Sequence, residues 1–203
     1  MIVETAGDSY KLILQFGMTG ALRYGQRAEL TGEEKKYARL IVEFQNGGEL
    51  LWINVRKLGK IYFVRDLNDV GILKTMGPEP LELTQDQFLE LLQKHATKNI
   101  KSFLMDQSDI AGIGNEYSNE ILFQAGIDPH HTIDSLSEKK RRDLFQVMER
   151  VLEQGIATKP GPLPDDWLTA HKNRMDCPKD SNQRLTKETI AGRSAVFCHQ
   201  CQH

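Results

Sequence analysis

The spacing of apolar residues changes once along this chain of 203 residues, and that change limits the folds open to it. Up to about residue 65, short runs rich in β-branched and aromatic residues alternate with turn signals such as NGG at 46–48. Such runs predict antiparallel strands joined as hairpins. From Thr84 onward, beginning with TQDQFLELLQKH, apolar residues recur with the helical period. The sequence therefore predicts an α+β protein whose sheet precedes its helices.

Two proline-rich segments mark the boundaries of the predicted domains. Pro78 and Pro80 each remove a backbone donor and fix φ, and KPGPLPDD at 159–166 holds three prolines and a glycine in eight residues. We predict a partial antiparallel β-sandwich over 1–76, a helical domain over 77–158, and a linker with a C-terminal hairpin over 159–203.

The composition fits a soluble protein. Hydrophobic residues make up 39% of the chain, enough for a core, and no run approaches the roughly 18 apolar residues of a membrane helix. The first residues lack the basic start and apolar run of a secretory signal, so we expect a cytoplasmic location and no membrane partner. A net charge of -2 argues weakly against nucleic-acid binding. It does not exclude such binding, because phosphates are bound by locally placed cations.

All three cysteines, Cys177, Cys198 and Cys201, lie within the last 27 residues. Their odd number and clustering favour a metal site over a disulfide framework. The spacing Cys198-x-x-Cys201 is an intact zinc knuckle, whereas Asp180 stands where the second cysteine of the other knuckle is expected. The candidates for the fourth ligand of a structural Zn²⁺ are Asp180, His203, His199 and His171. The alternative is three buried thiols without a metal.

The segment IAGIGN at 110–115 lies between two predicted helices. Its glycines let backbone amides approach a ligand, and the helix that follows presents unpaired N–H groups to an anion at Asn115 and Glu116. A phosphate-binding turn is one interpretation, and a turn that serves packing alone is the other. Arg193, next to Gly192 in the hairpin, is either a second phosphate ligand or a solvated surface charge.

The string MDQSDIAGIGNEYSNEILFQAGIDP at 105–129 resembles the helix-two-turn-helix signature of the formamidopyrimidine-DNA glycosylase and endonuclease VIII family. Four more blocks resemble the family in the same order, namely QFGMTG at 15–20, NVRKLG at 54–59, GPEPL at 77–81 and GRSAVFCHQCQ at 192–202. The resemblance implies a β-sandwich, a helix-two-turn-helix domain and a zinc-ribbon hairpin that together bind double-stranded DNA with a lesion or an abasic site.

The resemblance also implies roles for single residues. It assigns Lys101, Asn115 and Arg193 to the DNA phosphates. Glu120 matches the family's buried acidic residue near the site.

Three further residues match the family's DNA-inserting positions. Met18 would fill the void left by an everted base, Arg56 would pair with the orphaned partner, and Leu58 takes the place of a wedging phenylalanine. Extruding a nucleotide costs a few kcal/mol, which such insertions partly offset.

The departures from the family pattern concern its chemistry. The family begins with Pro-Glu, whose proline attacks the sugar C1′, whereas residues 1–4 here are Met-Ile-Val-Glu, so we predict no catalytic residue. Gln15 replaces a histidine, and the 159–166 loop is short for recognition of an oxidised purine.

These observations leave three hypotheses. The first is a base-excision-repair glycosylase and abasic-site lyase whose catalytic segment is missing from this chain. The second is a catalytically inactive binder of abasic or kinked DNA. The third is a zinc-ribbon protein that binds another protein. An incomplete sheet would also expose an edge and an apolar face, which predicts either self-association through that edge or marginal stability of residues 1–65.

Overall fold

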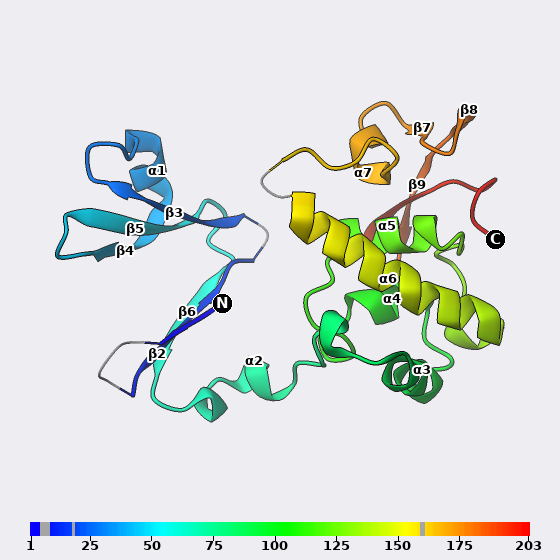
Figure 1. Cartoon of the computed structure of the whole chain (residues 1–203), viewed down its shortest axis with the longest axis horizontal. Coiled ribbons are helices and arrows are strands. Elements are labelled where there is room, and N and C mark those ends of the chain that lie inside the picture. Colours follow the sequence, from blue (N-terminus) through cyan, green and yellow to red (C-terminus); the bar gives the residue numbers. More distant parts are fainter. Residues whose placement is uncertain (5–8, 18, 159–160) are drawn as a thin grey trace. The chain divides into compact units, whose positions relative to one another are not determined.

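The computed structural model describes residues 1–4, 9–17, 19–158 and 161–203, so Met18 lies outside the described residues. The chain forms two compact units, Met1–Lys74 and Thr75–His203 (Figure 1). Among the described residues, no helix combines the length and apolar character needed to cross a bilayer.

The first unit contains two antiparallel three-stranded sheets. The first sheet has the order β1-β2-β6, with β1 at Ile2–Glu4, β2 at Lys11–Gln15 and β6 at Lys60–Val64. The second has the order β3-β5-β4, with β3 at Gly20–Gln26, β5 at Gly48–Asn54 and β4 at Ala38–Glu43. Apolar side chains of both sheets, including Leu14, Trp52 and Phe63, line a cavity of about 350 Å³. The predicted antiparallel sandwich is confirmed.

A short helix, α1 (Gly32–Tyr37), interrupts the strands and was not predicted. Glu34 N–H donates to Thr31 Oγ1 at 3.1 Å, and Thr31 N–H donates to the Glu34 carboxylate at 2.7 Å. This reciprocal capping box satisfies two backbone donors that the first helical turn leaves unpaired. The unit closes with a 3-10 turn at Leu67–Asp69 and α2 at Gly71–Lys74.

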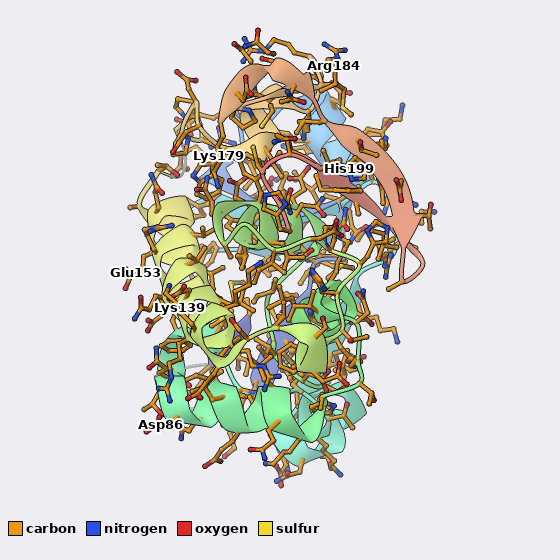
Figure 2. The ribbon with its side chains drawn as sticks, turned by 90° about the vertical axis from the view of Figure 1, so that its right-hand side faces the viewer. Asp86, Lys139, Glu153, Lys179, Arg184 and His199 are labelled. Atoms are coloured by element: carbon orange, nitrogen blue, oxygen red, sulfur yellow. The ribbon has the colours of Figure 1, made fainter. Side chains whose placement is uncertain are left out.

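The second unit is mainly helical. Its elements before the hairpins are a 3-10 turn at Pro80–Glu82, α3 at Gln85–Lys94, α4 at Ile100–Met105, α5 at Asn115–Gln124, a 3-10 turn at Ile133–Ser135, α6 at Glu138–Thr158 and α7 at Leu168–His171. Phe88 contacts both Phe103 and Phe145 in its core, and Phe88 and Phe103 are completely buried. Asp86, Lys139 and Glu153 point away from that core, as Figure 2 shows. The predicted helical fold of this part of the chain is confirmed.

Two short antiparallel hairpins end the chain. They consist of β7 at Asp176–Cys177, β8 at Asp180–Arg184, β9 at Thr186–Ile190 and β10 at Arg193–Phe197. Ala191 and Gly192 connect β9 to β10 with φ of 50° and 74°. Two positive φ values in a two-residue turn match the twist of the strands. The turn places Arg193 at the first position of β10.

Candidate nucleic-acid interface

The turn between α4 and α5 is built from glycines and braced by one side chain. Gly112 has a φ of 85°, in the region that favours glycine. The Gln107 amide holds both sides of the turn, because its Nε2 donates to Ile113 O at 2.9 Å and its Oε1 accepts from Gly112 N–H at 2.8 Å. Gly114 then caps α5 without any side-chain hydrogen bond. The first N–H groups of α5 are therefore available to an anion.

Lys101 of α4 lies directly behind this helix start and is fully buried. Its ammonium donates three hydrogen bonds to side-chain oxygens of α5, at Asn119 Oδ1 (2.5 Å), Asn115 Oδ1 (2.9 Å) and Ser118 Oγ (3.2 Å). All three partners are neutral, so none offsets the cost of burying the charge. Burial accordingly lowers the pKa of Lys101 to about 8.

Asn115, Ser118 and Asn119 share one face of α5 because residues three and four apart are neighbours on a helix. Of these three residues, the sequence analysis singled out only Asn115. The spacing N-x-x-S-N can be read from the sequence, but the hydrogen bonds of all three side chains to Lys101 cannot. With Asn115 Oδ1 accepting from Lys101, the amide nitrogen of Asn115 remains to donate elsewhere.

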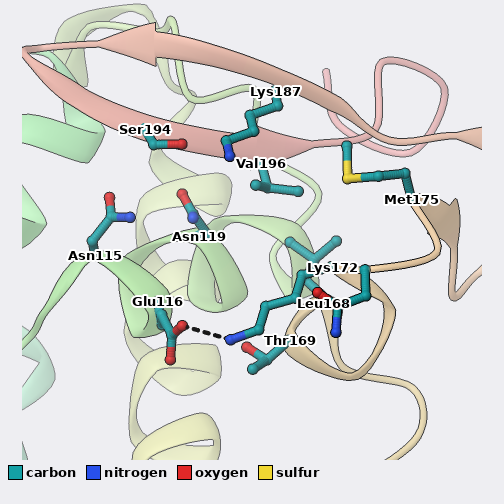
Figure 3. A pocket seen from close by; sticks show the side chains of 11 residues that line it. Asn115, Glu116, Asn119, Leu168, Thr169, Lys172, Met175, Lys187, Ser194 and Val196 are labelled. Carbon is teal, nitrogen blue, oxygen red and sulfur yellow. Dashed lines mark hydrogen bonds and ion pairs between the residues drawn. The ribbon is translucent and has the colours of Figure 1, made fainter.

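A cavity of about 490 Å³ joins the start of α5 to the last hairpin (Figure 3). Asn115 and Asn119 line one side, and Lys187 and Ser194 of the hairpin line the other. Lys172, which follows α7, reaches across the cavity to Glu116, with Nζ 2.9 Å from Oε1. The glycine turn and the hairpin therefore lie on the same side of this unit.

Arg193 stands at the tip of the same hairpin. It lines a smaller cavity of about 170 Å³ together with Ala191 and the α4 residues Ser102 and Met105. Both cations therefore lie near α4. Arg193 is exposed on the hairpin, whereas Lys101 is buried in α4 itself.

Glu120 is fully buried in the middle of α5. Its Oε2 accepts from Leu168 N–H at 2.8 Å, and its Oε1 accepts from Gln124 Nε2 at 2.9 Å. Burial raises the pKa of Glu120 to about 7, although these hydrogen bonds oppose the shift. In this structure Glu120 holds the start of α7, and through it the segment that carries Lys172.

The three cysteines form one cluster whose sulfur atoms all lie within 4.8 Å of one another. Burial and the two neighbouring thiols raise the pKa of Cys201 to about 12, because three thiolates repel one another unless a cation lies between them. Three sulfur ligands at this spacing fit a structural zinc, which would tie the two hairpins together. Asp180 is not in the cluster, and the fourth ligand stays unassigned.

The first unit brings two of the predicted loops together. Asn54, which is fully buried, donates from Nδ2 to Phe16 O at 2.9 Å and accepts at Oδ1 from Leu58 N–H at 3.2 Å. Arg56 N–H donates to Thr19 Oγ1 at 3.2 Å. The loops at 15–20 and 54–59 are thus joined by Asn54, whose role the sequence analysis missed.

Both DNA-inserting candidates that the structure describes lie on the surface of this unit. The side chain of Arg56 is exposed, and that of Leu58 is 50% exposed. A Cβ at Gly59 would lie 2.3 Å from Asn54 Nδ2, so the close approach of the loops requires glycine there.

A glycine turn that opens a helix beside a cysteine-anchored hairpin defines a DNA-binding protein of the helix-two-turn-helix class. Residues 76–163 match the model of the formamidopyrimidine-DNA glycosylase H2TH domain. The formamidopyrimidine-DNA glycosylase of Desulfitobacterium hafniense is 32% identical over 99% of this chain and 78% of its own length. The chain belongs to the formamidopyrimidine-DNA glycosylase family.

Solved structures agree with this assignment. The wild-type Lactococcus lactis Fpg (MutM), in complex with DNA containing N7-benzyl-Fapy-dG, is 27% identical with a TM-score of 0.80, covering 100% of this chain and 81% of that one. The Lactococcus lactis Fpg in complex with DNA containing an abasic site is 26% identical with a TM-score of 0.78, covering 96% and 75%. The fold predicted from the sequence is therefore confirmed.

Proposed function

We propose that this protein binds duplex DNA containing a damaged base or an abasic site, and that residues 75–203 hold its sugar-phosphate strand. The observation that carries the proposal is the cavity in which Asn115 of α5 faces Lys187 and Ser194 of the hairpin. The solved relatives bound to lesion-containing or abasic DNA support the same class of ligand.

The phosphate contacts follow from the geometry of α5. One phosphate binds the amide nitrogen of Asn115 and the backbone N–H groups of Asn115 and Glu116 at the start of α5. Arg193 at the hairpin tip binds a neighbouring phosphate. Lys101 acts as a positioning residue, because its buried ammonium fixes the Asn115 oxygen and turns the nitrogen outward.

Fluorescence anisotropy with an abasic-site duplex at several salt concentrations tests these contacts. Asn115→Ala should weaken binding about 10-fold, the value of one hydrogen bond to a charged group. Arg193→Ala should also reduce the salt slope by about 1, because it removes one cation from a phosphate. Lys139→Ala on the outer face of α6 is the matched control and should change neither quantity. Unchanged affinity of the Asn115 and Arg193 double variant would contradict the proposal.

We propose further that the 54–59 loop enters the duplex. Arg56 would pair with the orphaned base, Leu58 would act as the wedge, and Met18 remains the candidate for the void. A 2-aminopurine placed opposite the abasic site reports the disturbance of the stack. Leu58→Ala should leave the affinity for DNA nearly unchanged but reduce the change in 2-aminopurine fluorescence on binding. A fluorescence change equal to that of the wild type would exclude Leu58 as the wedge.

Glycosylase and abasic-site lyase chemistry is the second candidate function, and the family of the relatives favours it. Among the described residues we assign no nucleophile, and the amine of Met1 donates to Leu14 O of β2 at 3.1 Å. Borohydride trapping on abasic DNA separates the candidates. A covalent adduct supports the lyase, and binding without adduct or nicking supports an inactive repair protein that recognises the lesion.

The proposed zinc at the cysteine cluster serves this function by anchoring the hairpin that carries Arg193. We also propose that the protein is cytoplasmic and that it self-associates through the exposed sheet of residues 1–74.

A further inference from the structure

Asp180 occupies the second position of a zinc knuckle, but its side chain serves the backbone. Its Cα pairs with that of Cys177 across the β7–β8 hairpin. Its Oδ1 accepts from Asn182 N–H at 3.0 Å, which makes an Asx turn at the start of β8. The carboxylate lies outside the group of ligand atoms formed by the three sulfurs.

The histidines that could replace it lie outside the sulfur cluster. Both ring nitrogens of His171 have partners, since Nδ1 lies 3.0 Å from Asp176 Oδ2 and Nε2 lies 2.7 Å from Asp165 O. The ring of His199 packs edge-on against Phe197, with centroids 4.7 Å apart. Neither these two residues nor His203 joins the sulfur cluster.

The cluster is nevertheless held firmly in place from the helical side. Gln202 is buried, accepts from Cys198 N–H at 2.9 Å and donates to Ile127 O at 2.8 Å. Phe123 of α5 packs against Cys177 and Cys198. A fixed set of three sulfurs cannot easily turn toward a distant fourth side chain.

We propose that three thiolates are the whole protein contribution to the zinc site, so that its fourth position takes an exchangeable donor from solution. The inference rests on the structural zinc proposed above and assigns Asp180 to the turn instead of the metal. Zinc sites with three protein ligands characteristically admit water or another small donor at the fourth position. The ligand class here is a small neutral or anionic donor such as water, imidazole or a free thiol.

This site should hold zinc less tightly than one with four thiolates. The hairpin that carries Lys187, Arg193 and Ser194 would then be most rigid while zinc is bound, and DNA binding should weaken as zinc is removed. A four-cysteine finger lacks this sensitivity over the same range.

The test uses the full chain loaded with Co²⁺, whose absorption reports the number of thiolates and the fourth donor. Added imidazole should shift the visible spectrum of the wild type. Asp180→Asn keeps the acceptor of the Asx turn but is a poor metal ligand, and its spectrum and zinc affinity should match the wild type. Asp180→Cys supplies a fourth thiolate, so zinc should bind roughly 10-fold or more tightly and imidazole should have no effect. Asp176→Asn is the control for a nearby carboxylate.

Three results overturn the inference. A loss of zinc affinity of roughly 10-fold in Asp180→Asn would make the carboxylate a ligand. A wild-type spectrum insensitive to imidazole would show a fourth protein ligand. Failure to bind any Co²⁺ or Zn²⁺ removes the metal site itself, while the anisotropy measurements above decide DNA binding separately.

Discussion

Replacing Lys101 with methionine should change how the stability of the helical unit depends on pH. Methionine has a similar volume, is unbranched and carries no charge, so it fills the buried site without an ammonium. At a single pH the substitution changes the free energy of unfolding in two opposing ways, because it removes a buried charge and also three hydrogen bonds. The pH dependence of that free energy reports the buried charge alone.

The magnitude follows from the pKa of Lys101, which burial lowers from 10.5 to about 8. Between these values the unfolded chain keeps the proton that the folded chain has lost. The unfolded state then binds more protons, so the free energy of unfolding rises with pH in this window. At about 1.4 kcal/mol for each pKa unit, the wild type should gain about 3 kcal/mol relative to Lys101→Met between pH 8 and pH 10.5.

Urea denaturation from pH 7.5 to 10.5 measures this difference. The chain has two tryptophans, one in each unit, so a Trp52→Phe background leaves Trp167 as the reporter of the helical unit. Trp167 is 2% exposed and packs on Tyr117, so its fluorescence will change on unfolding. Lys94→Met, at an exposed position of α3, is the matched control and should run parallel to the background protein.

Parallel pH profiles for Lys101→Met and the background protein would refute the reasoning. They would mean that Lys101 stays protonated in the fold, either through water reaching the site or through an anion close to it. The hydrogen bond from Lys101 to Asn115 would then persist at high pH, and the uncompensated burial of the Lys101 charge would be refuted.

The other predictions concern Glu120, the cysteine cluster and the exposed sheet. Because burial raises the pKa of Glu120 from 4.5 to about 7, the folded chain keeps an extra proton, and the free energy of unfolding should fall by about 3 kcal/mol as pH rises through that interval. Glu120→Gln should flatten this slope when urea denaturation is repeated across the same interval. Removing zinc with a chelator should expose the amides of 176–203 to hydrogen exchange. Helices α3 and α6 should keep their protection, because they pack in a different hydrophobic cluster from the cysteines. An equal loss of protection in both regions would contradict this prediction. Light scattering should show self-association that Phe63→Asp weakens, because Phe63 is 61% exposed, and a wild-type monomer at all concentrations would exclude it.

Local signals predicted most of the fold. The apolar period predicted α3 and α6, and the glycines of 110–115 predicted the turn before α5. The missed helix α1 carries its own signal, because Thr31 and Glu34 have capping-box spacing; the surrounding strand pattern concealed it. The signal for β3 is weak, because its sequence, GALRYGQ, is mostly exposed and lacks clear alternation.

The site was less predictable, because its chemistry depends on contacts between distant segments. Sequence spacing cannot show that Lys101 is buried against α5, or that Asn54 joins two loops. The same applies to Asp180, whose position in a knuckle suggests a ligand while its side chain closes a local turn. In each case a hydrogen-bond partner decided the role.

Helix α5 has Asn115 as its first residue and Phe123, packed on the cysteine cluster, next to its last. Its 10 residues span about 15 Å, so one rigid rod sets the distance between the anion-binding end and the metal-binding end. Inserting a single residue into this rod would rotate Asn115 by about 100° around the helix axis while the cysteine end stayed packed. The length of α5 is therefore as constrained as the identity of its residues.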